Sequence, residues 1–191
     1  MKIIQICGTN GTGKTTLVKG LLKSGKFLKM TEPVDGRGRE WWYDGQVAII
    51  GKYNANNCCG VDAGNYSGDT LLNVIDTLLR NYAPKTIVFE DVRYGGLYSF
   101  KHKAKALGEQ YGYGYCAFTL IASLECVARR VIARTGNEGC DFDRMRSKAR
   151  QCIKSTAKIG QEGAETVMID TERFVQEAVL AALRMKVYGK A

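Results

Sequence analysis

Several features are scarce in this chain of 191 residues, and each scarcity narrows the class of protein. Histidine occurs once, at His102, and the seven cysteines form no C-x-x-C pair, so a structural zinc site is not expected. No apolar run approaches the length of a membrane span, so no membrane partner is expected. The chain also carries no N/T-K-x-D guanine-reading motif, which argues against a GTPase.

The cysteines and the N-terminal sequence indicate the cellular compartment in which the protein is expected. Three cysteines stand in apolar runs and the count is odd, which predicts reduced thiols. Removal of a secretory leader would remove the first apolar run and the glycine-rich loop after it, so secretion is not expected. We therefore expect a cytoplasmic protein.

That glycine-rich loop is the strongest motif present. The run 2–7 leads into Gly8-Thr9-Asn10-Gly11-Thr12-Gly13-Lys14-Thr15-Thr16, which contains G-x-x-x-x-G-K-[ST] between a predicted strand and a predicted helix. Glycines let successive N–H groups wrap a phosphate, Lys14 places charge on the β- and γ-phosphates, and the Thr15 hydroxyl is suited to Mg²⁺. Residues Gly8 to Thr16 are predicted to bind ATP with Mg²⁺.

Apolar runs alternate with helical patterns along the chain. The expected strands are 2–7, 27–31, 47–51, 86–91, 115–121 and 165–169, and the expected helices are 14–23, 69–81, 98–110, 123–135, about 142–158 and 171–186. Apolar strands between helices indicate a parallel sheet covered on both faces. We predict one α/β domain over 1–191, a P-loop kinase three-layer sandwich with a central parallel sheet of about five strands flanked by helices, plus a basic helical lid.

The segment 51–69 breaks this alternation because it carries almost no apolar periodicity. A structureless stretch of this length inside a compact domain is usually functional or disordered. Its tyrosines, asparagines and aspartates are typical of a binding loop, and we predict that it lies on the acceptor side of the site.

Size and motif favour a small kinase that passes a γ-phosphoryl group to a hydroxyl. Such an enzyme needs an acidic residue at the end of a central strand to orient Mg²⁺, and Glu90 and Asp91 end the run that begins at Thr86. Glu90, Asp91 and Thr15 are therefore the predicted metal-site residues.

The same chemistry needs a carboxylate near the acceptor hydroxyl, and two candidates remain open. Asp35 follows the second expected strand, and the carboxyl ends of parallel strands face the ligand crevice. Arg37 or Arg39 could then neutralise a phosphate on the acceptor. Asp62, in the 51–69 segment, is the alternative.

Arginines are also needed over the transferring phosphoryl group. Arg130 and Arg134 lie near the end of the 123–135 helix and are the predicted catalytic arginines, beside Lys14. The segment from about 126 to 160 carries nine Lys/Arg and three Asp/Glu, which predicts a basic lid. Arg150, Lys154 and Lys158 share one face of the following helix and suit a phosphate backbone as well as they suit water.

The net charge of +9 exceeds what a nucleotide site needs and suggests a second, extended polyanion. Basic and aromatic residues interleave between Arg93 and Lys105, where rings could stack bases while cations hold phosphates. The alternative is packing of these tyrosines at a sheet edge, which we favour for Tyr115.

With these residues in view, the chain resembles the bacteriophage 5-hydroxymethyluracil DNA kinases, P-loop kinases of the adenylate-kinase-like group. The resemblance rests on four segments that together span most of the chain. They are the loop Gly8 to Thr16, the run from Asp35 to Trp42, the run from Gly51 to Asp62 and the helix–hinge–helix run from Leu124 to Lys158. Cys58-Cys59-Gly60 stands where the family has a C-G-G-like run.

The resemblance implies ATP-dependent phosphorylation of the hydroxymethyl group of 5-hydroxymethyluracil in phage DNA, a step of thymine hypermodification. DNA would then be the partner, and the host cytoplasm the compartment. A base in duplex DNA must be extruded to reach a buried γ-phosphate, and the aromatic side chains expected above the strand ends are Trp41, Trp42, Tyr43, Tyr53 and Tyr66. One of the two tryptophans is expected in the core.

Two other functions remain open. One is a small-molecule kinase of the deoxynucleoside monophosphate type, for which the charge is incidental, and the other is a nucleic-acid-binding ATPase. The sequence does not fix the oligomeric state.

Overall fold

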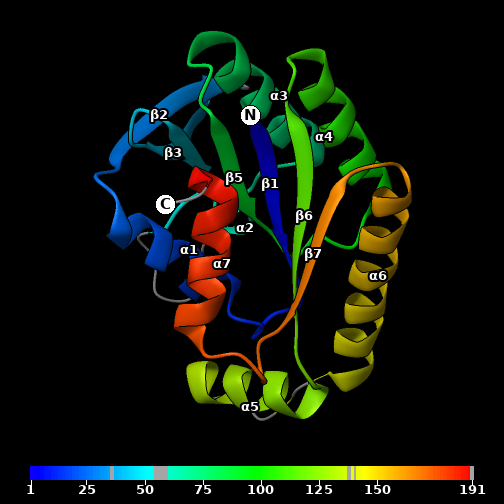
Figure 1. Cartoon of the computed structure of the whole chain (residues 1–191). Helices are drawn as coiled ribbons and strands as arrows, with labels where there is room; N and C mark the ends of the chain where they lie inside the picture. Colours follow the sequence, from blue (N-terminus) through cyan, green and yellow to red (C-terminus); the bar gives the residue numbers. More distant parts are fainter. Residues whose placement is uncertain (35–36, 54–59, 137–138, 140, 190–191) are drawn as a thin grey trace.

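A computed structural model describes residues 1–34, 37–53, 60–136, 139 and 141–189 (Figure 1). Seven strands form one sheet in the order β2-β3-β4-β5-β1-β6-β7. The strands are β1 (Lys2–Cys7), β2 (Leu28–Val34), β3 (Arg37–Tyr43), β4 (Val47–Ile50), β5 (Thr86–Glu90), β6 (Gly114–Ile121) and β7 (Glu165–Asp170). The helices are α1 (Lys14–Ser24), α2 (Gly60–Ala63), α3 (Gly68–Asn81), α4 (Tyr98–Gln110), α5 (Leu124–Thr135), α6 (Phe142–Gln161) and α7 (Gln176–Tyr188).

Five neighbouring strands, β4-β5-β1-β6-β7, pair in parallel, which confirms the predicted α/β fold with its central parallel sheet. The outer two strands differ from the prediction. β2 pairs antiparallel with β3, and β3 pairs antiparallel with β4. The expectation that the second strand belongs to the parallel set was therefore wrong, because it forms a hairpin with a strand that the sequence pattern did not predict.

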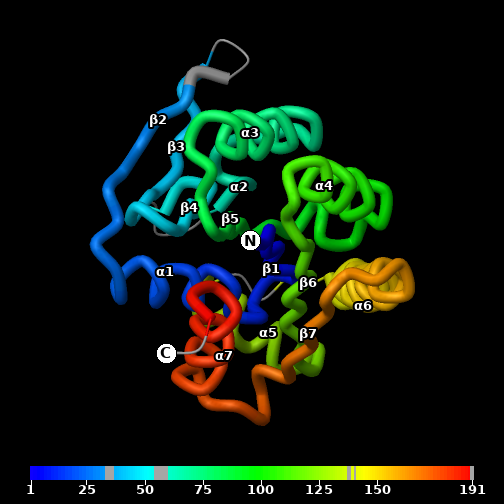
Figure 2. The backbone as a smooth tube through the Cα atoms, turned by 45° about the horizontal axis from the view of Figure 1, so that its top comes forward, coloured from blue at the N-terminus to red at the C-terminus, as the bar shows by residue number. Residues whose placement is uncertain are grey.

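Helices cover both faces of this sheet, as Figure 2 shows from above. On one face, α3 and α4 bury residues such as Leu71 and Phe100 against Phe89 of β5. On the other face, α1 and α7 bury Leu17 and Leu183 against the same sheet. Two separate apolar layers thus fix the sheet from both sides and hold the ends of its strands rigid.

Three of the described helices, α3, α5 and α6, begin at a side-chain cap. Ser67 caps α3 by accepting a hydrogen bond from the Thr70 N–H, and Ser123 caps α5 in the same way through Cys126 N–H. The last helix is different. It was expected to begin at Thr171, but α7 begins at Gln176. Residues 171–175 are therefore a connection at the carboxyl end of β7.

Helix α5 crosses beneath the carboxyl ends of the central strands, and α6 then runs back along the sheet (Figure 1). The second half of α6 is packed into the body, because Thr156 shares a hydrogen bond of 2.9 Å with Thr119 of β6 and Ile159 is fully buried. The lid predicted over about 126–160 stays a prediction, but the second half of α6 belongs to the packed body of the domain.

Candidate active site

The phosphate loop connects β1 to α1 at the carboxyl edge of the sheet. Its glycines adopt backbone conformations that side chains rarely allow, with φ of 142° at Gly8, 81° at Gly11 and 91° at Gly13. A Cβ on Gly8 would stand 2.6 Å from both the Leu120 carbonyl oxygen and Thr12 Oγ1. The loop therefore needs glycine at Gly8 for close packing as well as for its turn.

Lys14, the first residue of α1, is folded back over this loop. Its ammonium donates hydrogen bonds to the carbonyl oxygens of Gly8 at 2.9 Å and Thr9 at 2.8 Å. Burial lowers the pKa of Lys14, while the nearby charges of Glu90, Asp91 and Asp62 oppose that change. A buried cation held beside a ring of backbone N–H groups is suited to the oxygens of a polyphosphate.

Thr15 and Glu90 form the second part of the site. The Thr15 hydroxyl donates to Glu90 Oε1 at 2.8 Å, and the other carboxylate oxygen, Oε2, is buried without a hydrogen-bond partner among the described residues. Burial raises the pKa of Glu90 to about 7. A hydroxyl and a carboxylate with a spare oxygen fit the hard oxygen ligands that Mg²⁺ prefers, directly or through water.

Asp91 is held by its own neighbours. Oδ1 accepts hydrogen bonds from the N–H groups of Tyr94 at 2.6 Å and Gly95 at 2.5 Å, and Oδ2 accepts one from Gln5 Nε2 at 2.7 Å. These bonds shape the connection from β5 to α4. The role of Asp91 in holding Mg²⁺ stays a prediction. Glu90, in contrast, has a carboxylate oxygen without a hydrogen-bond partner among the described residues.

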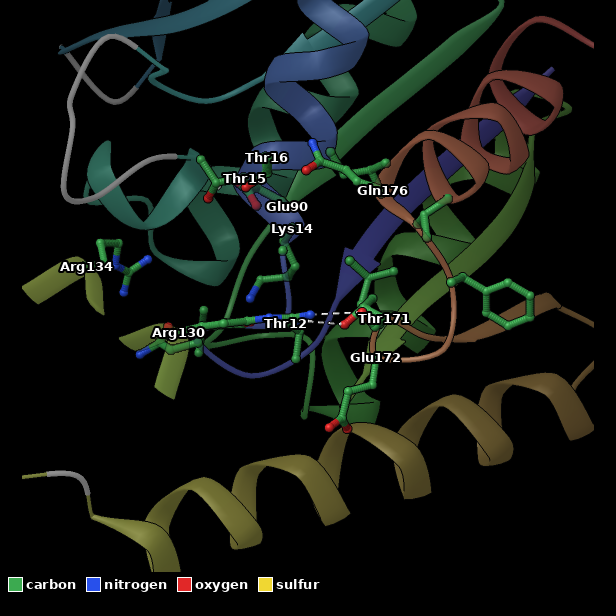
Figure 3. Close-up of a pocket in the computed structure, with 18 of the residues that line it drawn as sticks. Thr12, Lys14, Thr15, Thr16, Glu90, Arg130, Arg134, Thr171, Glu172 and Gln176 are labelled. Carbon is green, nitrogen blue, oxygen red and sulfur yellow. Dashed lines mark hydrogen bonds between the residues drawn. The ribbon is translucent and has the colours of Figure 1, made fainter. Parts of the chain in front are cut away.

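These groups line a cavity of about 700 Å³, which is the size of a small-molecule site (Figure 3). The phosphate loop forms its floor. The other residues that line it are Leu17, Asp62, Glu90, Asp91, Val92, Leu120, Arg130, Arg134, Thr171, Glu172, Arg173, Phe174, Val175, Gln176 and Val179. Of the predicted loop residues, those from Asn10 to Thr16 line the cavity, and Gly8 and Thr9 hold Lys14.

The two predicted arginines of α5 both line this cavity. Arg130 is held by hydrogen bonds, whereas Arg134 is exposed. Arg130 donates to Thr171 through Nη1 at 3.0 Å and Nη2 at 2.9 Å, and to the Gly11 carbonyl oxygen at 3.3 Å. It therefore ties the phosphate loop to the connection after β7. Arg134 is one turn further on, exposed, and its side chain is drawn toward the cavity in Figure 3.

Asp62 lies on α2, at the wall of the same cavity. Its Oδ2 accepts the Val92 N–H at 3.0 Å, and its Oδ1 lies 3.4 Å from Arg93 Nε without a well-aligned hydrogen bond. Asp62 thus has one oxygen anchored by a hydrogen bond and one that is buried beside Arg93, and its role as the base stays a prediction.

Asp35, the other candidate, lies outside the described residues. It was expected to follow a parallel strand, but β2 is antiparallel to β3 and is the outer strand of the sheet, separated from β1 by β3, β4 and β5. Arg39 of β3 is buried, donates to the Gly64 carbonyl oxygen at 2.6 Å and lies over the Tyr66 ring. Arg37 is exposed. Of the two candidates for the acceptor-side carboxylate, Asp62 is the one that the described structure places in the cavity of the phosphate loop.

The structure also brings in residues that the sequence did not point to. Residues 171–176, expected to be helical, form one wall of the cavity. Gly60 has a φ of 73°, and a Cβ there would stand 2.7 Å from Glu90 Cγ. Such residues could be predicted only from their position after a strand, because the connections after parallel strands line the ligand crevice.

The aromatic residues expected to stack a base are mostly core residues. Trp41, Tyr53 and Tyr66 are buried, and the Tyr66 hydroxyl donates to the Glu40 carbonyl oxygen at 3.0 Å. Trp42 and Tyr43 are half-buried. The expectation of five loop aromatics above the site was therefore wrong, because β3 carries three of them into the sheet. One tryptophan in the core was predicted, and Trp41 confirms it.

Side chains of the basic and aromatic segment between Arg93 and Lys105 are also largely engaged in contacts within the protein. Phe100 and Lys101 are buried, and Arg93 pairs with Asp62. Lys158 lies over the Tyr98 ring at 3.8 Å from its centroid. Tyr115 is buried and its hydroxyl donates to Gln5, which confirms that it packs in the protein, although β6 lies inside the sheet and not at its edge.

Comparisons with known proteins agree with this fold. No protein-family model and no curated protein sequence matches the chain. Among solved structures, the chain is similar to the tunicamycin resistance protein of Deinococcus radiodurans, with a TM-score of 0.58 and 16% identity over 99% of this chain and 96% of that one. It is also similar to a presumed kinase of Chloroflexus aurantiacus, with a TM-score of 0.55 and 15% identity over 100% and 97% of the two chains.

The fold is therefore an α/β fold of the kind found in P-loop kinases. Identities this low establish the fold alone. Among the described residues, no helix combines the length and the apolar character needed to cross a membrane.

Proposed function

We propose that the protein is an ATP-dependent kinase that phosphorylates a hydroxyl group. The observation that carries this proposal is the meeting of donor and acceptor groups in one cavity. Lys14, Thr15 and Glu90 form the donor half, and Asp62, whose Oδ1 is paired with Arg93 without a hydrogen bond, lines the same cavity. A nucleotide-binding ATPase needs the first three groups, whereas a carboxylate beside them suits transfer to an alcohol.

The residues have distinct roles in such a transfer. The bond from the γ-phosphorus to the bridging oxygen breaks, a bond to the acceptor oxygen forms, and the acceptor proton passes to Asp62 or solvent as ADP leaves. Lys14 and Arg134 supply positive charge beside the transferring group, and Arg130 keeps the loop and the opposite wall together. Thr15 and Glu90 would hold Mg²⁺, which would supply positive charge beside the phosphates.

For the acceptor, we propose the hydroxymethyl group of 5-hydroxymethyluracil in DNA. The resemblance of four sequence segments supports this acceptor, and so does the net charge of +9. Arg150 and Lys154 of α6 are exposed and form no ion pair with another described residue, which leaves their charge available to a phosphate backbone.

A free nucleoside or nucleotide is the second candidate. It is favoured by the burial of Trp41, Tyr53 and Tyr66, which removes stacking partners that an extruded base would use. A small acceptor also needs no extended surface.

One assay separates these acceptors. The protein is incubated with γ-labelled ATP and, in parallel, DNA containing 5-hydroxymethyluracil, unmodified DNA, the free nucleoside or its 5′-monophosphate, and the products are digested to nucleosides. Label on the modified base of DNA supports the proposal. Label only on free nucleosides or nucleotides favours the second candidate, and inorganic phosphate without labelled acceptor contradicts the kinase assignment.

A further inference from the structure

A second, smaller cavity of about 170 Å³ lies behind the phosphate loop. It is bounded by the start of that loop, by the connection from β5 to α4, and by α6. The residues that line it are Gly8, Val92, Arg93, Gly96, Lys148, Gln151 and Cys152. Val92 also lines the large cavity, so the two spaces adjoin at this residue.

Two cations reach the small cavity, and only one of them, Arg93, has an acidic partner among the described residues. Arg93 and Lys148 reach it from two different elements, and none of the residues that line it is acidic. Lys148 is only half-exposed, yet no other residue in the described part of the chain forms an ion pair or hydrogen bond with it. Arg93 is 3.4 Å from Asp62, the carboxylate of the neighbouring cavity. A charge held against the protein without a partner favours an anionic ligand.

The walls of this cavity are fixed by hydrogen bonds. Ser155 Oγ of α6 donates to the Gly95 carbonyl oxygen at 3.0 Å, while the Gly95 N–H donates to Asp91 Oδ1 at 2.5 Å. A Cβ on Gly96 would stand 3.3 Å from Gln151 Cβ, so the connection lies close against α6. The two cations are therefore carried by elements that are already held together, which lowers the ordering cost of binding.

We propose that this cavity binds a phosphate group of the acceptor, and that the acceptor is therefore a nucleotide unit and not a neutral nucleoside or sugar. The proposal rests on the proposed kinase function and names its substrate class. A volume of 170 Å³ holds about six water molecules, which suits one phosphate and is well below the size of a site for a whole nucleoside. Arg93 then connects the bound phosphate to Asp62, the group that receives the acceptor hydroxyl.

The phosphate has two sources, a 5′-phosphomonoester of a free nucleotide or a phosphodiester of DNA, and the charge of the cavity suits both. The test is calorimetric titration of the full chain, with Mg²⁺ and a non-hydrolysable ATP analogue saturating the donor site. The ligands are 5-hydroxymethyl-2′-deoxyuridine, its 5′-monophosphate, and a short single-stranded oligonucleotide with one such base. We expect the phosphate-carrying ligands to bind at least about tenfold more tightly than the nucleoside.

Variants assign that preference to the cavity. Lys148→Met and Arg93→Gln are each expected to remove most of it. Lys23→Met, exposed in the last turn of α1 and outside both cavities, is the matched control and is expected to retain the preference. Thermal unfolding of each variant shows that it is folded.

Each outcome bears on the proposal. A preference for the monophosphate, for the oligonucleotide or for both supports it and identifies the source of the phosphate. Equal binding of nucleoside and nucleotides overturns it, as does a preference that persists in both cavity variants or an acceptor series in which nothing binds. Binding of the ATP analogue is evaluated separately, because it tests the kinase function and not the phosphate site. If the analogue fails to bind, the kinase function fails, and the acceptor titrations are repeated without it to decide the phosphate site.

Discussion

A buried lysine beside a buried cysteine is the most unusual pair of side chains beneath the phosphate loop. Lys101 is fully buried, and its ammonium donates to Cys7 Sγ at 2.9 Å. Burial raises the pKa of Cys7, but a hydrogen bond from Cys152 and the charge of Lys101 outweigh it and lower that pKa to about 7. Lys101 therefore favours the thiolate form of Cys7, in which the two buried charges neutralise each other.

Truncating the two partners should have unequal effects. Cys7→Ala leaves the Lys101 charge buried without its partner, and we expect the free energy of unfolding to fall by about 3 kcal/mol or more. Lys101→Met leaves a thiol that can become neutral, so a loss of less than half that value is expected. Urea denaturation of both variants measures the difference, and equal losses would contradict the ion-pair description.

Glu90 should make stability depend on pH. Burial raises its pKa from 4.5 to about 7, so the folded protein favours the protonated form. This stabilising preference is complete below pH 4.5 and is lost as the pH rises through about 7. Relative to Glu90→Gln, the wild-type free energy of unfolding should fall by about 3 kcal/mol over this interval. Denaturant titrations at several pH values measure it, and parallel profiles would contradict the assigned pKa.

At the scale of the element, helix α2 places Asp62 and its position depends on a glycine. Gly60 has a φ of 73°, and a Cβ there would stand 2.7 Å from Glu90 Cγ and 2.9 Å from the Glu90 carbonyl oxygen. Gly60→Ala should displace α2, lower phosphoryl transfer about tenfold and leave ATP binding nearly unchanged.

Gly112→Ala is the matched control for this change. Its φ is 75°, and no other atom would lie within 4 Å of the added Cβ, so it introduces backbone strain without the clash. We expect a cost of about 1 kcal/mol from strain alone and unchanged turnover. If the two variants lose turnover to the same extent, the packing of Gly60 on Glu90 does not position the acceptor side.

The elements that were predicted correctly are those whose formation depends on residues close together in the sequence. α3 and α5 begin after Ser67 and Ser123, whose caps are local, and β1, β5 and β6 consist mainly of buried apolar residues. The donor half of the site was predictable for the same reason, because its motif is contiguous in the sequence.

The elements that were missed depend on distant partners. β3 was not predicted because Arg39 faces inward, and its burial is compensated by the Gly64 carbonyl oxygen and the Tyr66 ring. The start of α7 was misplaced because Thr171 has a capping side chain, which instead accepts a hydrogen bond from Arg130 of α5. Neither contact produces a hydrophobic periodicity from which it could be predicted.

At the scale of the whole molecule, excess positive charge is the feature that extends beyond the active site. Reversing it on the exposed face of α6, with Arg150→Glu and Lys154→Glu together, should weaken binding of modified DNA and reduce the dependence of its affinity on salt. ATP hydrolysis should change little, because neither residue lines the nucleotide cavity. Equal loss of DNA binding and hydrolysis would instead place these residues in a lid over the triphosphate.

The central claim is that one cavity holds both the donor and the acceptor of a phosphoryl transfer. The most direct measurement follows label from γ-labelled ATP into DNA containing 5-hydroxymethyluracil, with the wild-type protein and with Lys14→Ala. We predict label on the hydroxymethyl group with the wild type and none with Lys14→Ala, because Lys14 is the buried cation of the phosphate loop. Equal labelling by both proteins, or labelling of no acceptor by the wild type, would contradict the account.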